Sequence, residues 1–202
     1  MELTKFLLQQ GFSQSKSDYS LFTKVSKGGF VFILVYVNDL LITGDDDLSI
    51  AAVKAKLREA FTIKDLGLAR YFLSLEIARS TSGTFLNQRK YILNILTDAG
   101  LTAAKPARFP MAKGLKMSTE TGEFLPNPEA YRRVVGRLLY LTLTRPDISY
   151  AMQHLSQFLQ APRAPHYEAA MHVLRYLKGT IHRGLFYPQA NDMQVTSYCD
   201  AD

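Results

Sequence analysis

Carboxylates are the side chains of this chain best suited to chemistry, and they occur in three places. Asp39 follows Asn38 behind an apolar run, three consecutive aspartates occupy positions 45–47, and Asp200 lies close to the end of the sequence. Converging carboxylates bind hard divalent cations, which activate hydroxyl groups and neutralise phosphate charge. Because this chemistry needs several carboxylates at one point, the elements that carry these residues decide whether it is possible.

The first of these places is the end of an apolar run. Eight apolar residues, many of them aromatic or β-branched, span 30–37, which predicts a strand that is buried on both faces in the middle of a sheet. Asn38 and Asp39 are predicted to form a two-residue turn, because Asn and Asp tolerate positive φ, and residues 40–43 return antiparallel. This hairpin places the carboxylate of Asp39 at the edge of the sheet.

The aspartates at 45–47 have two interpretations. Clustered carboxylates suit a hard cation, but Asp47 also stands directly before a helical pattern that covers 48–61. An Asp at that position accepts hydrogen bonds from the free N–H groups of the first helical turn, where acidic groups are favoured. We favour the capping interpretation over the metal site.

The rest of the pattern mixes strands and helices, which indicates an α+β fold. Apolar residues recur at helical spacing over 2–10, 48–61, 88–99, 128–143, 146–160 and 167–179. Strand patterns cover 19–25, 30–37, 40–43, 70–79, 84–86, 184–187 and 193–198. Residues 101–127 are rich in Pro, Gly, Lys and Thr without a sustained period, so they are predicted to form an extended connector.

The composition is that of an ordinary globular protein. Of 202 residues, 47% are apolar and 21% are charged, so disorder is not expected. The longest apolar run is too short for a bilayer span and no signal peptide is visible, so we expect no membrane partner. The single cysteine, Cys199, excludes an intramolecular disulfide and a cysteine-based zinc cluster, and it fits an intracellular, reducing compartment such as the cytoplasm or nucleus.

Positive charge is concentrated in one part of the chain. The net charge is +6, and residues 101–145 alone hold 8 basic and 3 acidic groups. Basic and aromatic side chains share one face of the helix predicted over 128–143, and two more basic residues open the helix predicted over 88–99: Arg133, Arg137, Tyr140, Arg89 and Lys90. A phosphate backbone would explain these positions and so would a solvated surface, and both interpretations stay open.

Three histidines could suggest a metal site. His154, His166 and His172 share no i, i+4 pair within one predicted helix and lack a partnered carboxylate pattern. We therefore expect them at the surface or at an interface.

One motif connects these features to a known family. Tyr36-Val37-Asn38-Asp39 and the residues after it resemble the Tyr-X-Asp-Asp hairpin of reverse transcriptases, in the form typical of copia-type LTR retrotransposons. Further stretches resemble the same polyprotein in the same order along essentially the whole chain: 64–67, 71–77, 85–91, 144–151, 174–180 and 198–202. The chain is similar to the C-terminal part of the polymerase domain and to the start of ribonuclease H.

The resemblance implies a division into domains. Residues 1–86 resemble part of the palm, an antiparallel sheet with packed helices; residues 87–180 resemble the helical thumb or connection region; and residues 181–202 resemble the first ribonuclease H strands. Leu73 and Ser74 correspond to the primer grip, which holds nucleic acid, and a Gly is usual at the position of Ser74. Asp200 corresponds to the first metal-binding carboxylate of ribonuclease H.

The resemblance also implies a catalytic site that this sequence matches in part. Reverse transcriptases hold Mg²⁺ or Mn²⁺ with an Asp on an earlier strand and with the Asp pair of the hairpin. Tyr36 and Asp39 match that hairpin, but Asn38 stands at the first Asp position and offers a neutral carbonyl. We also expect the chain to start after the earlier Asp. Asp39 is therefore expected to be a vestigial catalytic residue and a weak metal ligand, with no ion held productively.

Three functions from different classes follow. The first is a truncated reverse transcriptase, an RNA-directed DNA polymerase domain that is inactive in isolation. The second is a non-catalytic module that binds an RNA–DNA hybrid or a single strand weakly, through Leu73, Ser74, Arg89, Lys90, Arg133, Arg137 and Tyr140. The third is an interaction remnant that joins an intact polymerase, or the remainder of a retrotransposon polyprotein, through an exposed sheet edge.

Overall fold

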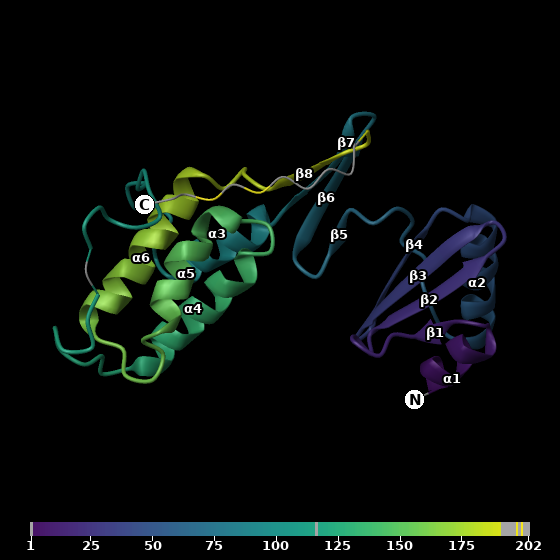
Figure 1. The fold of residues 1–202 in the computed structure, drawn as a ribbon, viewed down its shortest axis with the longest axis horizontal. Helices are drawn as coiled ribbons and strands as arrows, with labels where there is room; N and C mark the ends of the chain where they lie inside the picture. The colour runs from purple at the N-terminus through teal and green to yellow at the C-terminus, as the bar shows by residue number, and fades with distance from the viewer. Residues whose placement is uncertain (1, 116, 191–196, 198, 200–202) are drawn as a thin grey trace. The chain divides into compact units, whose positions relative to one another are not determined.

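The computed structural model describes residues 2–115, 117–190, 197 and 199, and these form two compact units (Figure 1). Unit 1 extends to Ala69 and unit 2 starts at Arg70. Asp200 and most of the strand predicted over 193–198 lie outside the described residues. Each unit has its own sheet, helices and buried core, so the two are described separately.

Unit 1 is a four-stranded antiparallel sheet, in the order β1-β2-β3-β4, packed against two helices. Its core joins Leu7 of the first helix, Ile33 of the sheet, and Val53 and Leu57 of the second helix. The elements are α1 (Glu2–Gln9), β1 (Ser13–Gln14), β2 (Leu21–Ser26), β3 (Gly29–Tyr36), β4 (Asp39–Gly44) and α2 (Asp47–Ala60).

The apolar run forms β3, which lies between β2 and β4, so the prediction of a strand in the middle of a sheet is confirmed. Val31 and Ile33 point into the core and are at most 1% exposed, whereas Phe30 on the opposite face is 37% exposed. Alternate residues of a strand face opposite sides of its sheet. The prediction that both faces are buried is therefore wrong.

The hairpin turn lies one residue earlier than predicted. Val37 and Asn38 form the two-residue turn, and Asp39 is the first residue of β4, where it pairs with Tyr36. Val37 has a φ of +50°, a conformation that β-branched residues rarely adopt. The register between β3 and β4 therefore decides which residues turn, and the tolerance of Asn and Asp for positive φ does not.

The aspartates after β4 bind backbone and hydroxyl groups. Asp46 caps α2, one residue before the predicted Asp47, because its carboxylate accepts hydrogen bonds from the Ser49 N–H at 2.9 Å and from the Ser49 hydroxyl at 2.6 Å. Asp45 accepts a hydrogen bond of 2.6 Å from the backbone N–H of Phe30. The capping interpretation is confirmed, with Asp46 as the capping residue.

Unit 2 joins a second four-stranded antiparallel sheet, in the order β5-β6-β7-β8, to a group of helices with one core. The elements are β5 (Tyr71–Phe72), β6 (Leu75–Ser80), β7 (Gly83–Asn87), α3 (Arg89–Asp98), α4 (Pro128–Leu141), the 3-10 helix η1 (Pro146–Ile148), α5 (Ser149–Ser156), α6 (Ala164–Gly179) and β8 (Leu185–Pro188). With two antiparallel sheets and six α-helices in the described residues, the α+β class is confirmed. No helix in the described part of the chain has the length and apolar character needed to cross a bilayer.

Unit 2 differs from the sequence prediction in two places. The strand predicted over 70–79 is broken by a tight turn at Leu73 and Ser74, so β5 and β6 form a hairpin. β8 pairs with β7 and therefore belongs to the same sheet as that hairpin. The second compact unit begins at Arg70. The palm, thumb and ribonuclease H divisions stay predictions.

A buried arginine connects the helices of unit 2. Arg145, which is 1% exposed, donates hydrogen bonds to both carboxylate oxygens of Asp147 and to the carbonyl and hydroxyl oxygens of Thr180, just after α6. Tyr176 of α6 donates a further hydrogen bond to Asp147 at 2.6 Å. This network fixes the junction between α4 and α5 to the end of α6.

Candidate functional site: two hairpin turns and a basic helix

The first turn carries the side chains that the resemblance assigns to catalysis. Tyr36, Asn38 and Asp39 are exposed at the end of the hairpin between β3 and β4. Val37, between them, is 82% exposed with its φ at +50°, and a residue held in such a conformation costs about 1–3 kcal/mol. This turn presents one amide and one carboxylate to solvent.

The residues at this turn do not fit a two-metal centre. Among the described residues, no three His, Cys, Asp or Glu side chains lie together where they could hold a metal ion. Hydrogen bonds from Ser49, and then from Ser26, hold the pKa of Asp46 below its usual value, so that carboxylate is already engaged. Asp39 brings one charge and Asn38 one neutral oxygen, fewer charged ligands than two divalent ions require.

The second turn joins β5 to β6 within unit 2. Leu73 has a φ of +47° and Ser74 a φ of +65°, and Phe72 pairs with Leu75 beside them. Two positive φ values define a type I′ turn, which favours Asn and Gly. The hydroxyl of Tyr140, from α4, donates a hydrogen bond to the carbonyl of Leu73. The structure thus brings Leu73, Ser74 and Tyr140 together, three residues predicted to bind nucleic acid.

The outer face of α4 is less basic than its sequence indicates. Arg137 forms an ion pair of 2.6 Å with Asp98, the last residue of α3, and its guanidinium lies 5.7 Å from the centre of the Tyr91 ring. Arg133 is exposed and forms no ion pair with any described residue. Gly136 is exposed between the two arginines, and an added Cβ there would meet no atom within 4 Å. This face therefore offers Arg133 next to an open position.

The start of α3 carries the other two predicted basic residues, Arg89 and Lys90, both exposed. The backbone N–H of Lys90 donates a hydrogen bond of 2.7 Å to the carboxylate of Glu76, and its ammonium lies 5.6 Å from the centre of the Tyr71 ring. Basic residues oppose the helix dipole at this end, and the Glu76 carboxylate offsets that effect. A hollow beside them is lined by Arg70, Tyr71, Glu76, Ile77, Ala78, Asn87 and Lys90.

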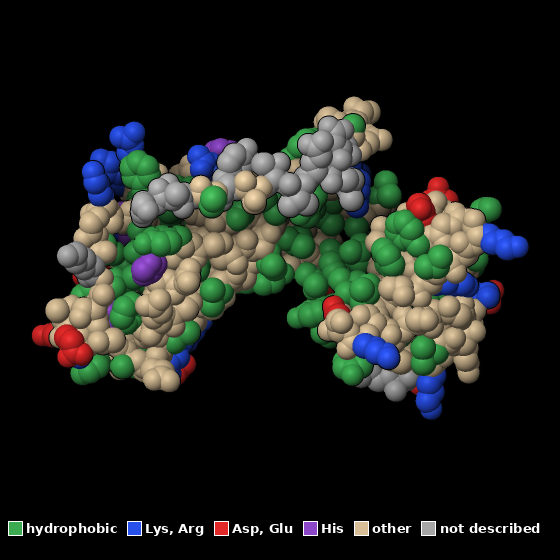
Figure 2. Space-filling model, viewed as in Figure 1, with side chains coloured by type: hydrophobic (Ala, Val, Ile, Leu, Met, Phe, Trp, Pro, Cys, Tyr) green, Lys and Arg blue, Asp and Glu red, His purple; other side chains and the backbone are tan. Residues whose placement is uncertain are grey.

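These basic groups do not form one cluster. Asp98, at the end of α3, contacts Arg137 within α4. Gln88, just before the start of α3, contacts Thr144, just after the end of α4. The two helices are therefore antiparallel. Arg89 and Arg133 are therefore separated by about 15 Å or more, the length of a ten-residue helix. On the face drawn in Figure 2, the described Lys and Arg side chains likewise lie in several small, separate groups.

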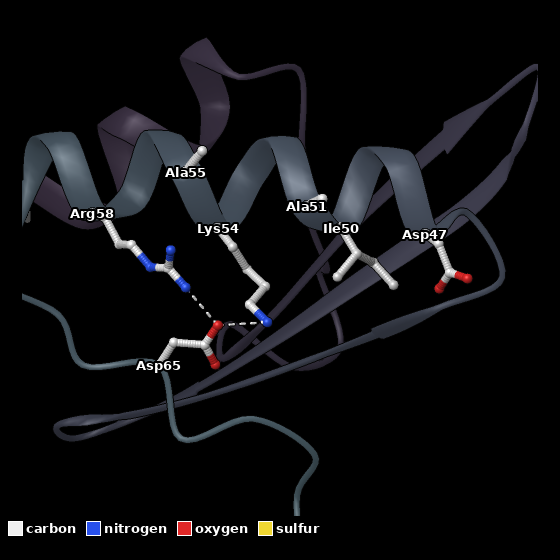
Figure 3. Close-up of a pocket in the computed structure, with 7 residues that line it drawn as sticks. All are labelled: Asp47, Ile50, Ala51, Lys54, Ala55, Arg58 and Asp65. Atoms are coloured by element: carbon white, nitrogen blue, oxygen red, sulfur yellow. Dashed lines mark hydrogen bonds and ion pairs between the residues drawn. The ribbon is translucent and has the colours of Figure 1, made fainter.

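A polar cluster beside α2 was not predicted from the sequence. Lys54 and Arg58 both form ion pairs with Asp65, at 2.6 and 2.7 Å (Figure 3). The hydrogen bond from Lys54, followed by that from the Gly67 N–H, lowers the pKa of Asp65 to about 2. This cluster fastens the segment after α2 to the helix through one carboxylate that both cations share.

Comparison with known proteins decides the family. A sequence profile described as "Reverse transcriptase (RNA-dependent DNA polymerase)" matches residues 1–113. This chain belongs to the reverse transcriptase family. No solved structure matches this reverse transcriptase region.

The relatives of this reverse transcriptase region include transposon polyproteins. The "Retrovirus-related Pol polyprotein from transposon RE1" of Arabidopsis thaliana is 43% identical over 202 residues, which is 100% of this chain and 14% of the polyprotein. The corresponding polyprotein from transposon TNT 1-94 of Nicotiana tabacum is 36% identical over 100% of this chain and 16% of its own length. The chain thus spans only a small part of these polyproteins.

A shorter relative is covered more fully. The "Uncharacterized mitochondrial protein AtMg00810" of Arabidopsis thaliana is 40% identical over 172 residues, which is 85% of this chain and 71% of that protein. The predicted resemblance to a copia-type reverse transcriptase is confirmed, and the chain corresponds to a fragment of that domain. The roles of individual residues, from Asp39 to Tyr140, stay predictions.

Proposed function

We propose that this reverse transcriptase region contacts nucleic acid through unit 2 and does not add nucleotides by itself. In this proposal residues 1–86 act as part of the palm, residues 87–180 as thumb or connection, and residues 181–202 as the start of ribonuclease H. The nucleic acid is an RNA–DNA hybrid or a single strand, and the protein partner is the remainder of a Pol polyprotein. Reverse transcriptases in general use a divalent metal, Mg²⁺ or Mn²⁺.

The observation that carries the catalytic half of the proposal is the pair Asn38 and Asp39 at an exposed turn. Asn38 offers a neutral oxygen where the family hairpin has a carboxylate, and no three described His, Cys, Asp or Glu side chains lie together where they could hold a metal ion. Several kcal/mol of charge stabilisation are lost with one carboxylate, which corresponds to roughly 10²–10⁴ in rate. Restoring one carboxylate at position 38 would still leave two adjacent ligands without a third.

Primer extension tests this half of the proposal. The purified chain, with a primed RNA template and Mg²⁺ or Mn²⁺, should show no incorporation above a control without enzyme, and Asn38→Asp should show none either. An active reverse transcriptase in the same mixture is the positive control. Extension by the wild-type chain, or its appearance in the Asn38→Asp variant, would show that a working metal site forms here.

The binding half of the proposal is supported by the exposed groups of unit 2. Arg133 is exposed without an ion pair among the described residues, and Arg89 and Lys90 add positive charge at the start of α3. Gly136 leaves the α4 surface open beside Arg133, which permits close approach of a sugar–phosphate backbone. Separate cations of this kind bind phosphates without reading sequence, so we expect weak binding that falls steeply with salt.

Fluorescence anisotropy with a labelled RNA–DNA hybrid tests the binding half. Arg133→Ala should weaken binding and reduce the slope of log K against log salt by about 1, the loss of one phosphate contact. Arg137→Ala should reduce the slope less, because its guanidinium is paired with Asp98. Lys5→Ala removes an exposed charge from α1 and is the matched control. If Arg133→Ala behaves like Lys5→Ala, α4 is ordinary solvated surface.

A further inference from the structure

The turn between β5 and β6 adopts a conformation that its own residues disfavour. Leu73 and Ser74 both have positive φ, +47° and +65°, although neither is Gly, Asn or Asp. β5 contains only two residues, which pair as Phe72 with Leu75 and Tyr71 with Glu76, and one more backbone hydrogen bond joins the Ile77 N–H to the Arg70 carbonyl. The residue types of the turn and its short strand pairing therefore stabilise this conformation only weakly.

A side chain from a distant helix contacts this turn. Tyr140 lies on α4, 67 residues after Leu73, and its hydroxyl donates a hydrogen bond to the Leu73 carbonyl oxygen. That oxygen lies at the turn itself, between the two residues with positive φ. The contact therefore joins the least favourable part of the hairpin to a helix of the unit 2 core.

The Tyr140 ring packs against a neighbour that is itself held by α4 and α3. It packs edge-on against Tyr91 of α3, with ring centres 5.4 Å apart and planes at 79°. The Arg137 guanidinium lies 5.7 Å from the centre of the Tyr91 ring and pairs with Asp98 at 2.6 Å. The Tyr91 ring, which also lies beside Arg137, thus restricts the Tyr140 ring whose hydroxyl donates to the Leu73 carbonyl.

We propose that Tyr140 is a positioning residue that holds the Leu73–Ser74 turn against α4, so that the hairpin and the Arg133 face of α4 meet nucleic acid as one rigid surface. This inference rests on the proposed binding function. It assigns Tyr140 a different role from the one its sequence indicates, because a hydroxyl engaged with Leu73 and a half-buried ring are poorly placed for stacking on a base. It also gives the family Gly at position 74 a physical reason, since Gly adopts positive φ freely.

The first test removes only the hydroxyl. Tyr140→Phe keeps the ring contact with Tyr91, so the helical core should remain intact by circular dichroism. The Ile77 N–H, which donates to the Arg70 carbonyl at 2.9 Å, reports on the hairpin, and its hydrogen exchange should accelerate roughly 3–10-fold. The Ile92 N–H in α3 should be unchanged. Tyr150→Phe, which removes an exposed hydroxyl from α5, is the matched control.

Rescue distinguishes positioning from a general loss of stability. Ser74→Gly makes the turn favourable without help from α4, so Ser74→Gly combined with Tyr140→Phe should return Ile77 exchange to within about twofold of wild type. Should Tyr140→Phe loosen the whole unit, Ile92 exchange would rise as well. Ser74→Gly would then fail to restore it, and the positioning role would be wrong.

Binding of the labelled hybrid distinguishes the positioning role of Tyr140 from the proposed nucleic-acid binding. Tyr140→Phe should weaken binding about 2–5-fold with an unchanged salt slope, because no charge is lost, and Ser74→Gly should restore the affinity. Unchanged Ile77 exchange in Tyr140→Phe would overturn the positioning role, whatever the binding result. A wild-type chain that binds no hybrid would overturn the proposed function, while the exchange experiment would still decide whether Tyr140 holds the turn.

Discussion

The two hairpin turns of this protein have similar geometry and opposite surroundings. Each is a two-residue turn that places non-glycine residues at positive φ: Val37 in unit 1, and Leu73 and Ser74 in unit 2. Val37 is 82% exposed, and no side chain of the described residues donates a hydrogen bond to its turn. The second turn receives a hydrogen bond from Tyr140, whose ring is packed against α3.

Both turns contain strained backbone, but different parts of the structure hold it in place. Backbone strain persists where the surrounding structure determines it, and it is often found at functional sites. At the first turn the pairing of β3 with β4 sets the geometry. At the second turn the strained backbone is tied to the helices that carry the basic groups. The first turn is therefore shaped by strand pairing, whereas the second is also joined to a helix by the hydrogen bond from Tyr140.

The largest effect should come from breaking the buried hydrogen-bond network of unit 2, which has no counterpart among the described residues at the first turn. Arg145→Ala leaves Asp147 and the Thr180 carbonyl without their buried partner, so unit 2 should lose about 3–5 kcal/mol of unfolding free energy. Unit 1 should be unaffected, which hydrogen exchange at Ile33 and Leu138 would show. Arg183→Ala removes an exposed cation near Asp147 and should cost less than about 1 kcal/mol. Equal losses in both units would contradict the division.

Acid should also act on one unit only. His166 is buried, with Nδ1 accepting from the Arg163 N–H at 3.0 Å and Nε2 next to the Ser118 carbonyl, and burial lowers the pKa of His166 from its usual 6.5. Its folded pKa lies below its unfolded pKa. Its contribution to stability is therefore complete above about pH 6.5 and is lost as the pH falls through the folded pKa.

Thermal unfolding at pH 7.5 and pH 5 would check this. Unit 2 should lose about 1–2 kcal/mol, the cost of a buried donor left without its acceptor, whereas unit 1 contains no histidine and should lose little. His166→Gln should abolish the difference between the two pH values, and His182→Gln, at an exposed position, should preserve it. A loss of the same size in the His166→Gln variant would mean that another group is responsible.

The smallest effects on unfolding free energy should come from glycine substitutions that relieve the backbone strain at each turn. Val37→Gly relieves a β-branched residue at positive φ and should stabilise unit 1 by about 1 kcal/mol, after the entropy that Gly loses on folding. Ser74→Gly should stabilise unit 2 by less, about 0.5 kcal/mol, because Ser tolerates this conformation better and Tyr140 already holds the turn. Chemical denaturation of both variants would measure this, and a larger gain at Ser74 would reverse the comparison.

The sequence predicted the elements well, because apolar periodicity follows directly from burial. The helices over 48–61, 88–99 and 128–143 and the strand over 30–37 appear within about two residues of their predicted bounds. The hairpin turn was misplaced by one residue, since cross-strand register prevails over the turn preference of Asn. The break at Leu73 and Ser74 was missed because neither residue is the Gly or Asn that two successive positive φ values favour.

The candidate site was harder to predict, because its contacts join distant parts of the chain. Arg137 pairs with Asp98, 39 residues away, and Tyr140 donates a hydrogen bond to Leu73, 67 residues away. Two side chains of the predicted basic and aromatic helix face therefore contact other parts of the protein. His166 was expected at the surface or an interface but is buried, where it stacks on Phe158 with ring centres 3.8 Å apart. The periodicity of a single helix does not reveal which neighbour covers it.

A titration followed by amide NMR tests the central claim most directly, because it observes both turns in one sample. A short RNA–DNA hybrid added to the labelled protein without metal should shift the amides of Ser74, Arg133 and Gly136 together. The amides of Val37 and Asn38 should stay in place. Shifts confined to Val37 and Asn38, with Ser74 and Arg133 unmoved, would show that nucleic acid is held at the catalytic hairpin and would contradict this account.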